Sequence, residues 1–234
     1  MTHIDDSSPI AAVQRLHDAL GLPSGFFDSL LKEDDWSFVI KLHALIEAAL
    51  AHVIAHRLGD EIADIVASLD MGERRGKVGF AVALKLIDER ERSFLKLLSS
   101  LRNRCAHGVK QAVRFSLEAY VAELDRNGRR EFLRACNASN PDETITIADI
   151  TTNRQKFVTE NPKLSIWMTS LFFLAVLYVQ KETAELIRRS ERSIIELSRL
   201  MTSPLAPLVR LGTSETNDKL DSASAAANPP RVDA

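Results

Sequence analysis

The residue types best suited to chemistry lie in one short stretch, residues 99–108, which reads SSLRNRCAHG. Arg102, Asn103 and His107 fall at the predicted end of an apolar-periodic helix, and Gly108 is the residue type that commonly follows a helix. Asn103 and His107 are four residues apart and therefore share a helix face. The helix dipole favours a protonated imidazole at that end. A histidine beside a fixed cation is suited to proton transfer on a phosphate ester.

The same stretch also fits a simpler interpretation, in which a helix ends in basic side chains that complement its dipole. Glu47 is a second candidate, because it lies among Ala44, Ala48 and Ala51, small residues that let another helix approach closely. An acid at that position can orient a cationic side chain from a neighbouring helix. Otherwise it is a surface carboxylate.

Two predicted helices must position these side chains. The first covers residues 36–58, is capped by Asp34 or Asp35 and ends at Gly59. The second begins at a capping box formed by Asp88 and Glu91 and runs to His107. Each carries an apolar stripe at helical spacing, which predicts a buried face: Val39, Leu42, Ile46, Ala49, Leu50 and Val53 in the first, and Phe94, Leu98, Leu101 and Cys105 in the second.

The rest of the chain also reads as mainly helical. Residues 61–70 and 80–87 predict helices, and 113–124 is predicted to start extended and end helical. A long helix is predicted from Pro162 toward Met201, and its apolar run, residues 164–179, is shorter than a membrane span and predicts the central helix of a bundle. Residues 182–201 are amphipathic and suited to pairing with a partner helix.

Between these helices, residues 125–160 are predicted to form a polar excursion, which holds either one short strand pair at the alternating residues from Thr144 or an ordered loop over the bundle. We interpret its arginines as a solvated charged turn, or else as a patch for RNA or an acidic partner: Arg126, Arg129, Arg130 and Arg134. The N-terminal residues 1–8 and the C-terminal residues 203–234 have the composition of disordered segments. The sequence therefore predicts one all-α domain over residues 9–202.

Composition and motifs argue against several functions. The formal net charge of −2 gives no global attraction to nucleic acid, and the sequence shows no DNA-reading motif. The glycine-rich residues 72–79 lack the spacing and the Ser or Thr of a phosphate-binding P-loop. We interpret His43, His52 and His56 as a solvated face, and expect no metal and no cofactor. Two cysteines and a polar N-terminus favour a reducing, cytoplasmic location without a membrane anchor.

The chain resembles a known family in the residues around the motif. Residues 76–88, GKVGFAVALKLID, and residues 94–108, FLKLLSSLRNRCAHG, look like the mannitol operon repressor family, as does the later NRQKF at residues 153–157. More broadly, Arg-Asn-x-x-x-His resembles the active motif of the HEPN domains, which are all-helical bundles. The resemblance covers residues 36–177.

This resemblance has two implications for function. The mannitol repressor family implies a regulator of gene expression, here acting through protein or RNA contacts because no DNA-binding motif is visible. The HEPN motif implies instead a metal-independent endoribonuclease of the toxin or phage-defence type, working as a homodimer. In that enzyme His107 would move protons, Arg102 would hold the phosphate, Asn103 would orient the histidine or the substrate, and Glu47 would anchor Arg102. A third possibility is an interaction module that uses residues 182–201.

Overall fold

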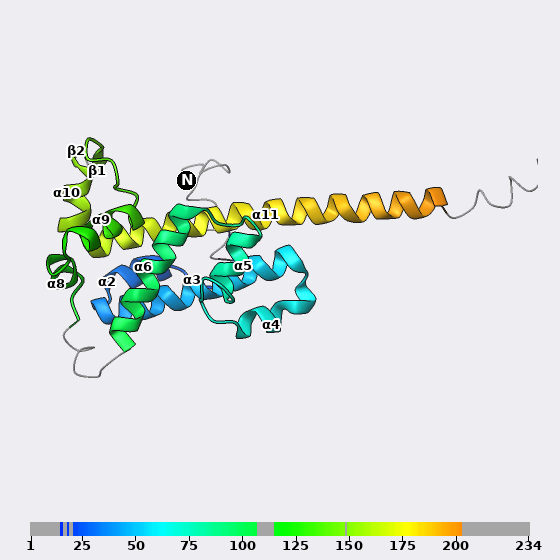
Figure 1. Cartoon of the computed structure of the whole chain (residues 1–234), viewed down its shortest axis with the longest axis horizontal. Coiled ribbons are helices and arrows are strands. Elements are labelled where there is room, and N and C mark those ends of the chain that lie inside the picture. Colours follow the sequence, from blue (N-terminus) through cyan, green and yellow to red (C-terminus); the bar gives the residue numbers. More distant parts are fainter. Residues whose placement is uncertain (1–14, 16–17, 19–20, 107–114, 148, 203–234) are drawn as a thin grey trace, which may run out of the picture. The chain divides into compact units, whose positions relative to one another are not determined.

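The computed structural model describes residues 15, 18, 21–106, 115–147 and 149–202, and this part of the chain is mostly helical (Figure 1). The all-α class predicted from the sequence is confirmed, with a single two-stranded sheet in the described residues. The chain divides into two compact units, Met1–Glu185 and Leu186–Ala234, which are described separately. The predicted single domain over 9–202 stays a prediction. The segments 1–8 and 203–234 lie outside the described residues.

The first unit is built on α3 (Asp35–Leu58), which follows the short α2 (Phe26–Lys32). Asp34 caps α3 as predicted, because its side chain accepts a hydrogen bond from the Ser37 backbone N–H at 3.0 Å. The six predicted stripe residues of α3 are all fully buried. Gly59 ends the helix with φ 128°, a backbone conformation that side-chain-bearing residues rarely adopt.

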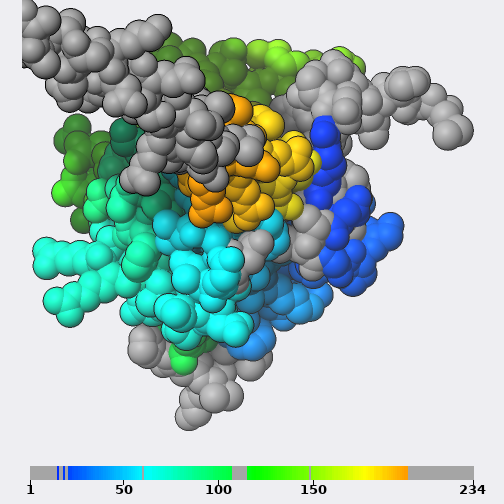
Figure 2. All heavy atoms as spheres, turned by 90° about the vertical axis from the view of Figure 1, so that its right-hand side faces the viewer, coloured from blue at the N-terminus to red at the C-terminus, as the bar shows by residue number. Residues whose placement is uncertain are grey.

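Three short helical segments connect α3 to the motif helix: η1 (Asp60–Ile62), α4 (Ala63–Ser68) and α5 (Lys77–Ala83). Figure 2 shows the end of α3, α4 (cyan) and the segment leading into α5 (teal) on one face. The helix expected over 80–87 begins and ends earlier than predicted. It ends early because the backbone N–H groups of Lys85 and Leu86 turn back to Val82 and Ala81, with Lys85 at φ 58°.

The motif helix is α6 (Glu89–Ala106), and it packs against α3, α5 and α9. Its predicted capping box is confirmed. The Asp88 carboxylate accepts from the backbone N–H of Arg90 at 2.7 Å, and the Glu91 carboxylate accepts from that of Asp88 at 2.8 Å. The predicted stripe of Phe94, Leu98, Leu101 and Cys105 is buried.

Residues 115–160 hold more helix than the sequence predicts. After α8 (Leu117–Ala122) come α9 (Arg126–Ala135), the antiparallel strands β1 (Thr144–Ile147) and β2 (Ile150–Asn153), and α10 (Arg154–Glu160). The strand pair is confirmed, but the interpretation of the arginine cluster as a turn is wrong. The side chain of Asp125 caps a helix there. Phe132 and Leu133 are buried on the inner face of this helix, and its four arginines are exposed.

The last helix, α11 (Pro162–Thr202), begins at the predicted proline. Up to Glu185 it belongs to the first unit, where it buries Ile166, Phe173, Leu174 and Leu177. The apolar run is only partly core, since Phe172 is 64% exposed and Val179 56% exposed. In the second unit the described residues 186–202 are helical and expose Leu186, Ile187, Ile194, Ile195 and Leu197.

Two helices, α3 and residues 162–199 of α11, are long and apolar enough to cross a membrane by length and composition alone. Their most apolar windows are 61% and 50% buried inside the protein. Core helices of soluble proteins share these properties, so the expected cytoplasmic location stays a prediction.

Candidate functional site: a polar cleft beside the motif helix

A cleft of about 660 Å³ lies between α3, the loop before α5 and the outer face of α6. It brings together three of the four predicted site residues, Glu47, Arg102 and Asn103. His107 lies outside the described residues, so its predicted role stays a prediction. The cleft also includes His43 and Lys96, which were not predicted as site residues.

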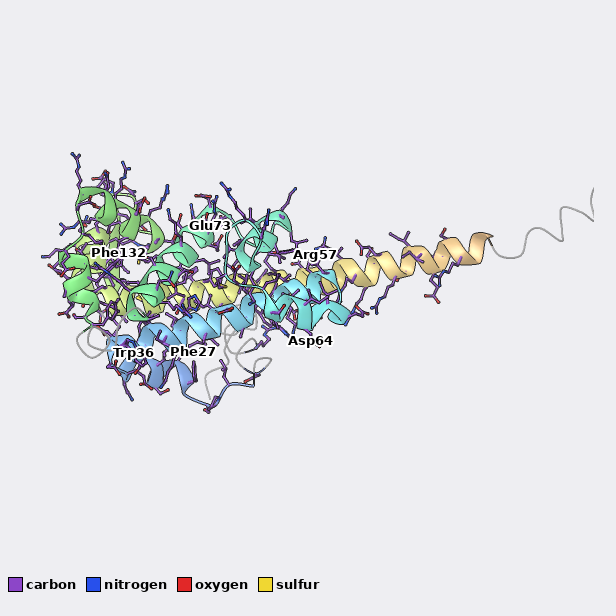
Figure 3. All side chains as sticks on the ribbon, turned by 60° about the horizontal axis from the view of Figure 1, so that its bottom comes forward. Phe27, Trp36, Arg57, Asp64, Glu73 and Phe132 are labelled. Carbon is purple, nitrogen blue, oxygen red and sulfur yellow. The ribbon has the colours of Figure 1, made fainter. Side chains whose placement is uncertain are left out.

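Arg102 and Asn103 are both exposed in the last turn of α6. The Arg102 guanidinium donates from Nη1 to Asn103 Oδ1 at 3.3 Å and makes no ion pair with any described residue. The turn that carries them is fixed from the inside. Trp36, at the start of α3 (Figure 3), donates from its indole Nε1 to the carbonyl of Cys105 at 3.1 Å. This bond joins one of the last carbonyls of α6 to α3, so the arginine is presented from an anchored helix end.

The expected contact between Glu47 and Arg102 is replaced by another ion pair. Glu47 Oε1 lies 2.8 Å from the ammonium nitrogen of Lys77, and no ion pair joins Glu47 to Arg102 in the described structure. Lys77 is only 2% exposed, and it also donates to the carbonyl oxygens of Ala67 and Leu69. A buried ammonium is stable only when it is paired and hydrogen-bonded. Glu47 therefore serves as the ion-pair partner of Lys77.

The loop between α4 and α5, to which Lys77 is hydrogen-bonded, forms one wall of the cleft. Asp70, Gly72 and Glu73 are the loop residues that line this wall. Its glycines explain why the 72–79 segment looks like a phosphate loop without being one. A Cβ on Gly76 would lie 2.1 Å from Asp70 Oδ1, and one on Gly79 would lie 2.8 Å from the Glu73 carbonyl oxygen. The glycines therefore serve close backbone packing.

The acids of the cleft are engaged, whereas its surface cations are not. Glu47 pairs with Lys77, Glu73 pairs with Arg92 at 2.9 Å, and Asp70 Oδ1 accepts from the Gly72 backbone N–H at 2.9 Å. Arg102 and Lys96 make no ion pair with any described residue. Asp70 keeps its negative charge on the loop wall, whereas the α6 wall presents the unpaired positive charges of Arg102 and Lys96, which favour an anion such as a phosphate at that side of the cleft.

His43 corrects the interpretation of the three histidines as a solvated face. Its side chain is 10% exposed and lies in the cleft, with Nδ1 3.8 Å from Glu47 Oε2. Burial lowers the pKa of His43; the Glu47 carboxylate opposes this shift, and the positive charges of Arg102 and Lys77 add to it. His43 is therefore neutral near pH 7, and a neutral imidazole beside an arginine can accept a proton.

His52 and His56 do not belong to this cleft. Their rings pack edge to face at 4.4 Å, and His56 Nδ1 lies 3.9 Å from Glu185. In the described residues no three or more side chains of the metal-binding types gather at one point.

Sequence reasoning missed His43, which lines the cleft, and Lys77, which is buried behind the loop wall and pairs with Glu47. A signal existed for each. Lys77 is a lysine between two glycines, four residues before the apolar Ala81, which places it on an inward face. His43 directly follows Leu42 of the buried stripe and lies four residues before Glu47.

Comparison with known proteins finds no matching family, no matching characterised protein and no matching solved structure. The resemblance to the mannitol operon repressor family and to HEPN domains thus remains a prediction from the motif residues.

Proposed function

We propose that this protein is a regulator of gene expression, of the mannitol operon repressor type, that acts by binding RNA through the cleft at Arg102. The observation that supports the proposal is that Arg102 and Lys96 line the cleft without an ion pair to any described residue, whereas the cleft acids Glu47 and Glu73 are paired with cations. Arg102 would contact a phosphate through its planar guanidinium, and Asn103 would add a hydrogen bond to the same nucleotide. The cleft is open and polar, which suits a single strand better than an apolar ligand.

The test is the affinity for a labelled single-stranded RNA, measured by fluorescence anisotropy at fixed salt. Arg102→Ala should weaken binding about tenfold, the value of one charged hydrogen-bonding contact. Lys32→Ala is the control, because Lys32 is an exposed cation outside both the cleft and the arginine cluster of α9, and it makes no ion pair with any described residue. Equal losses in both variants would overturn the proposal, since they would indicate a diffuse charge effect.

A second candidate function, metal-independent RNA cleavage, is favoured by one specific observation: His43 lines the same cleft as Arg102. In such a reaction a base takes the proton of the ribose 2′-hydroxyl, the oxygen attacks phosphorus, and the 5′-oxygen leaves with a proton from an acid. His43 would serve as the base and His107 as the acid, while Arg102 neutralises the phosphate. Cutting of RNA in EDTA that is lost in Arg102→Ala and in His107→Ala supports this candidate. Binding without cutting supports the regulator.

The expected homodimer also stays a proposal. The apolar side chains exposed on residues 186–197 of α11 supply a surface of the kind that pairs with a second helix. Sedimentation of the wild type should give a dimer, and Ile194→Asp should shift it to a monomer. A monomeric wild type would contradict the proposal.

A further inference from the structure

A second pocket, of about 710 Å³, lies on the first unit between the start of α6, the end of α9, the loop from α9 to β1, the start of α10 and α11. Figure 1 shows α9, α10 and the hairpin grouped at one end of this unit. Small-molecule sites are typically about 300–1,000 Å³, so the pocket has the size for a single small ligand. None of its lining residues is part of the cleft at Arg102.

Arginines dominate the charge of this pocket. Three line it, Arg90 of α6, Arg134 of α9 and Arg154 of α10. Arg154 is neutralised by Glu143, whose Oε1 lies 2.6 Å from its Nη1. Arg90 and Arg134 are exposed and make no ion pair or side-chain hydrogen bond with any described residue.

The remaining acid of the pocket, Glu91, forms no ion pair with either free arginine. Its Oε2 accepts from the Asp88 backbone N–H in the capping box, and Glu91 has no ion pair in the described structure. The lining therefore holds three arginines and two carboxylates, which leaves a positive charge that the exposed guanidinium groups of Arg90 and Arg134 present. Planar guanidinium groups recognise phosphate by parallel hydrogen bonds.

The other side of the pocket is aromatic. Phe172 lines it and is 64% exposed, although it belongs to a helix whose neighbouring residues Phe173 and Leu174 are core. Phe94 and Phe173 also line it, with ring centroids 5.9 Å apart. An exposed ring beside a buried aromatic pair offers a flat apolar surface on which a base can stack.

Amide side chains complete the lining. Asn137 has φ 56° and follows the end of α9. There the backbone N–H groups of residues 137 and 138 donate to the carbonyl oxygens of Arg134 and Leu133, which ends the helix. Asn140 uses its Oδ1 to accept from the Asp142 backbone N–H at 3.1 Å, so its NH₂ group remains available. Amides both donate and accept, which suits the polar edge of a base.

We propose that this pocket binds a nucleoside phosphate, with the phosphate at Arg90 and Arg134 and the base against Phe172. The ligand is a free nucleotide rather than an RNA chain, because the pocket volume fits one nucleotide. The proposal does not depend on RNA binding at Arg102. A chain that regulates gene expression and also binds a nucleotide has a second, separate site at which a metabolite can act.

Isothermal titration of the full chain with AMP and GMP tests this assignment, with inorganic phosphate and adenosine as fragments. We expect saturable binding of a nucleotide and binding about tenfold or more weaker for each fragment. Arg90→Ala, Arg134→Ala and Phe172→Ala should each weaken nucleotide binding about tenfold, whereas Arg129→Ala, on the same helix as Arg134, should not. All four side chains are exposed, so these variants should keep the circular dichroism of the wild type.

Three results would overturn the assignment. The first is no binding of either nucleotide. The second is an equal loss in Arg129→Ala and Arg134→Ala. The third is phosphate binding as tight as nucleotide binding, which would remove the role of Phe172. Loss of nucleotide binding in Arg102→Ala, with Arg134→Ala unaffected, would place the nucleotide in the cleft instead and so also contradict the proposal.

Discussion

Replacing Lys77 by Met should destabilise the protein, because this lysine joins Glu47 of α3 to the backbone of residues 67 and 69 beside the cleft. Its ammonium is 2% exposed and has three acceptors: Glu47 Oε1 at 2.8 Å, the Ala67 carbonyl at 3.0 Å and the Leu69 carbonyl. A hydrogen bond from a charged donor contributes about 1.5–3 kcal/mol, and the low end applies because the Glu47 side chain is 35% exposed. Met keeps the apolar stem and avoids the desolvation of a charge, which offsets part of the loss. The net expectation is a loss of about 2 kcal/mol in the free energy of unfolding.

Urea unfolding followed by circular dichroism measures this loss. About 2 kcal/mol corresponds to a midpoint lower by roughly 1 M for an m-value near 2 kcal/mol/M. Lys85→Met is the matched control, because it makes the same change at an exposed lysine that has no ion pair with any described residue. The control should change stability by less than about 0.5 kcal/mol. If both variants lose the same stability, Lys77 does not hold the loop and the reasoning is refuted.

Three further predictions concern buried groups. Since burial lowers the pKa of His43, the unfolded chain takes up its proton at higher pH than the folded chain; the stability of the wild type should fall as pH drops through about 6.5. His43→Gln should reduce that fall, which urea unfolding at pH 7.5 and 5.5 compares. Gly76→Ala should lower the free energy of unfolding by at least about 2 kcal/mol, because its Cβ would meet Asp70 Oδ1 at 2.1 Å; an unchanged melting temperature would contradict this. Burial raises the pKa of Cys105 to about 11 and that of Cys136 to about 12, so a thiol reagent near pH 8 should modify them only after unfolding, and rapid modification of the native protein would be inconsistent with the structure.

Much of the helical frame was predictable because local signals and burial agree. Asp34 as a cap, the Asp88–Glu91 box and the apolar stripes of α3 and α6 each follow from spacing alone, and the structure confirms them. α9 was missed for a physical reason. Its sequence, RNGRREFLRA, buries only a few residues and begins with a charged run that reads as a turn, while its stability comes from the Asp125 cap and from packing of Phe132 on α6.

The site was predictable only in part, because its partners come from distant elements. In the structure, the motif residues Arg102 and Asn103 share a cleft with Glu47. The ion-pair partner of Glu47 is Lys77, which is 30 residues away in the sequence. No periodicity identifies such a pair, since a lysine in a glycine-rich segment is most often exposed. The exposure of Phe172 was not predictable either, because the sequence of an apolar run does not show which of its residues face outward.

The most direct test of RNA binding at the cleft is the titration of His43, followed by NMR of its imidazole, with and without a saturating single-stranded RNA. The positive charge of Arg102 contributes to the lowered pKa of His43. A phosphate bound at Arg102 neutralises that charge, so RNA should raise the pKa of His43 in the wild type and leave it unchanged in Arg102→Ala. RNA that binds without moving the His43 titration would show that the nucleic acid lies elsewhere and would contradict the proposed function.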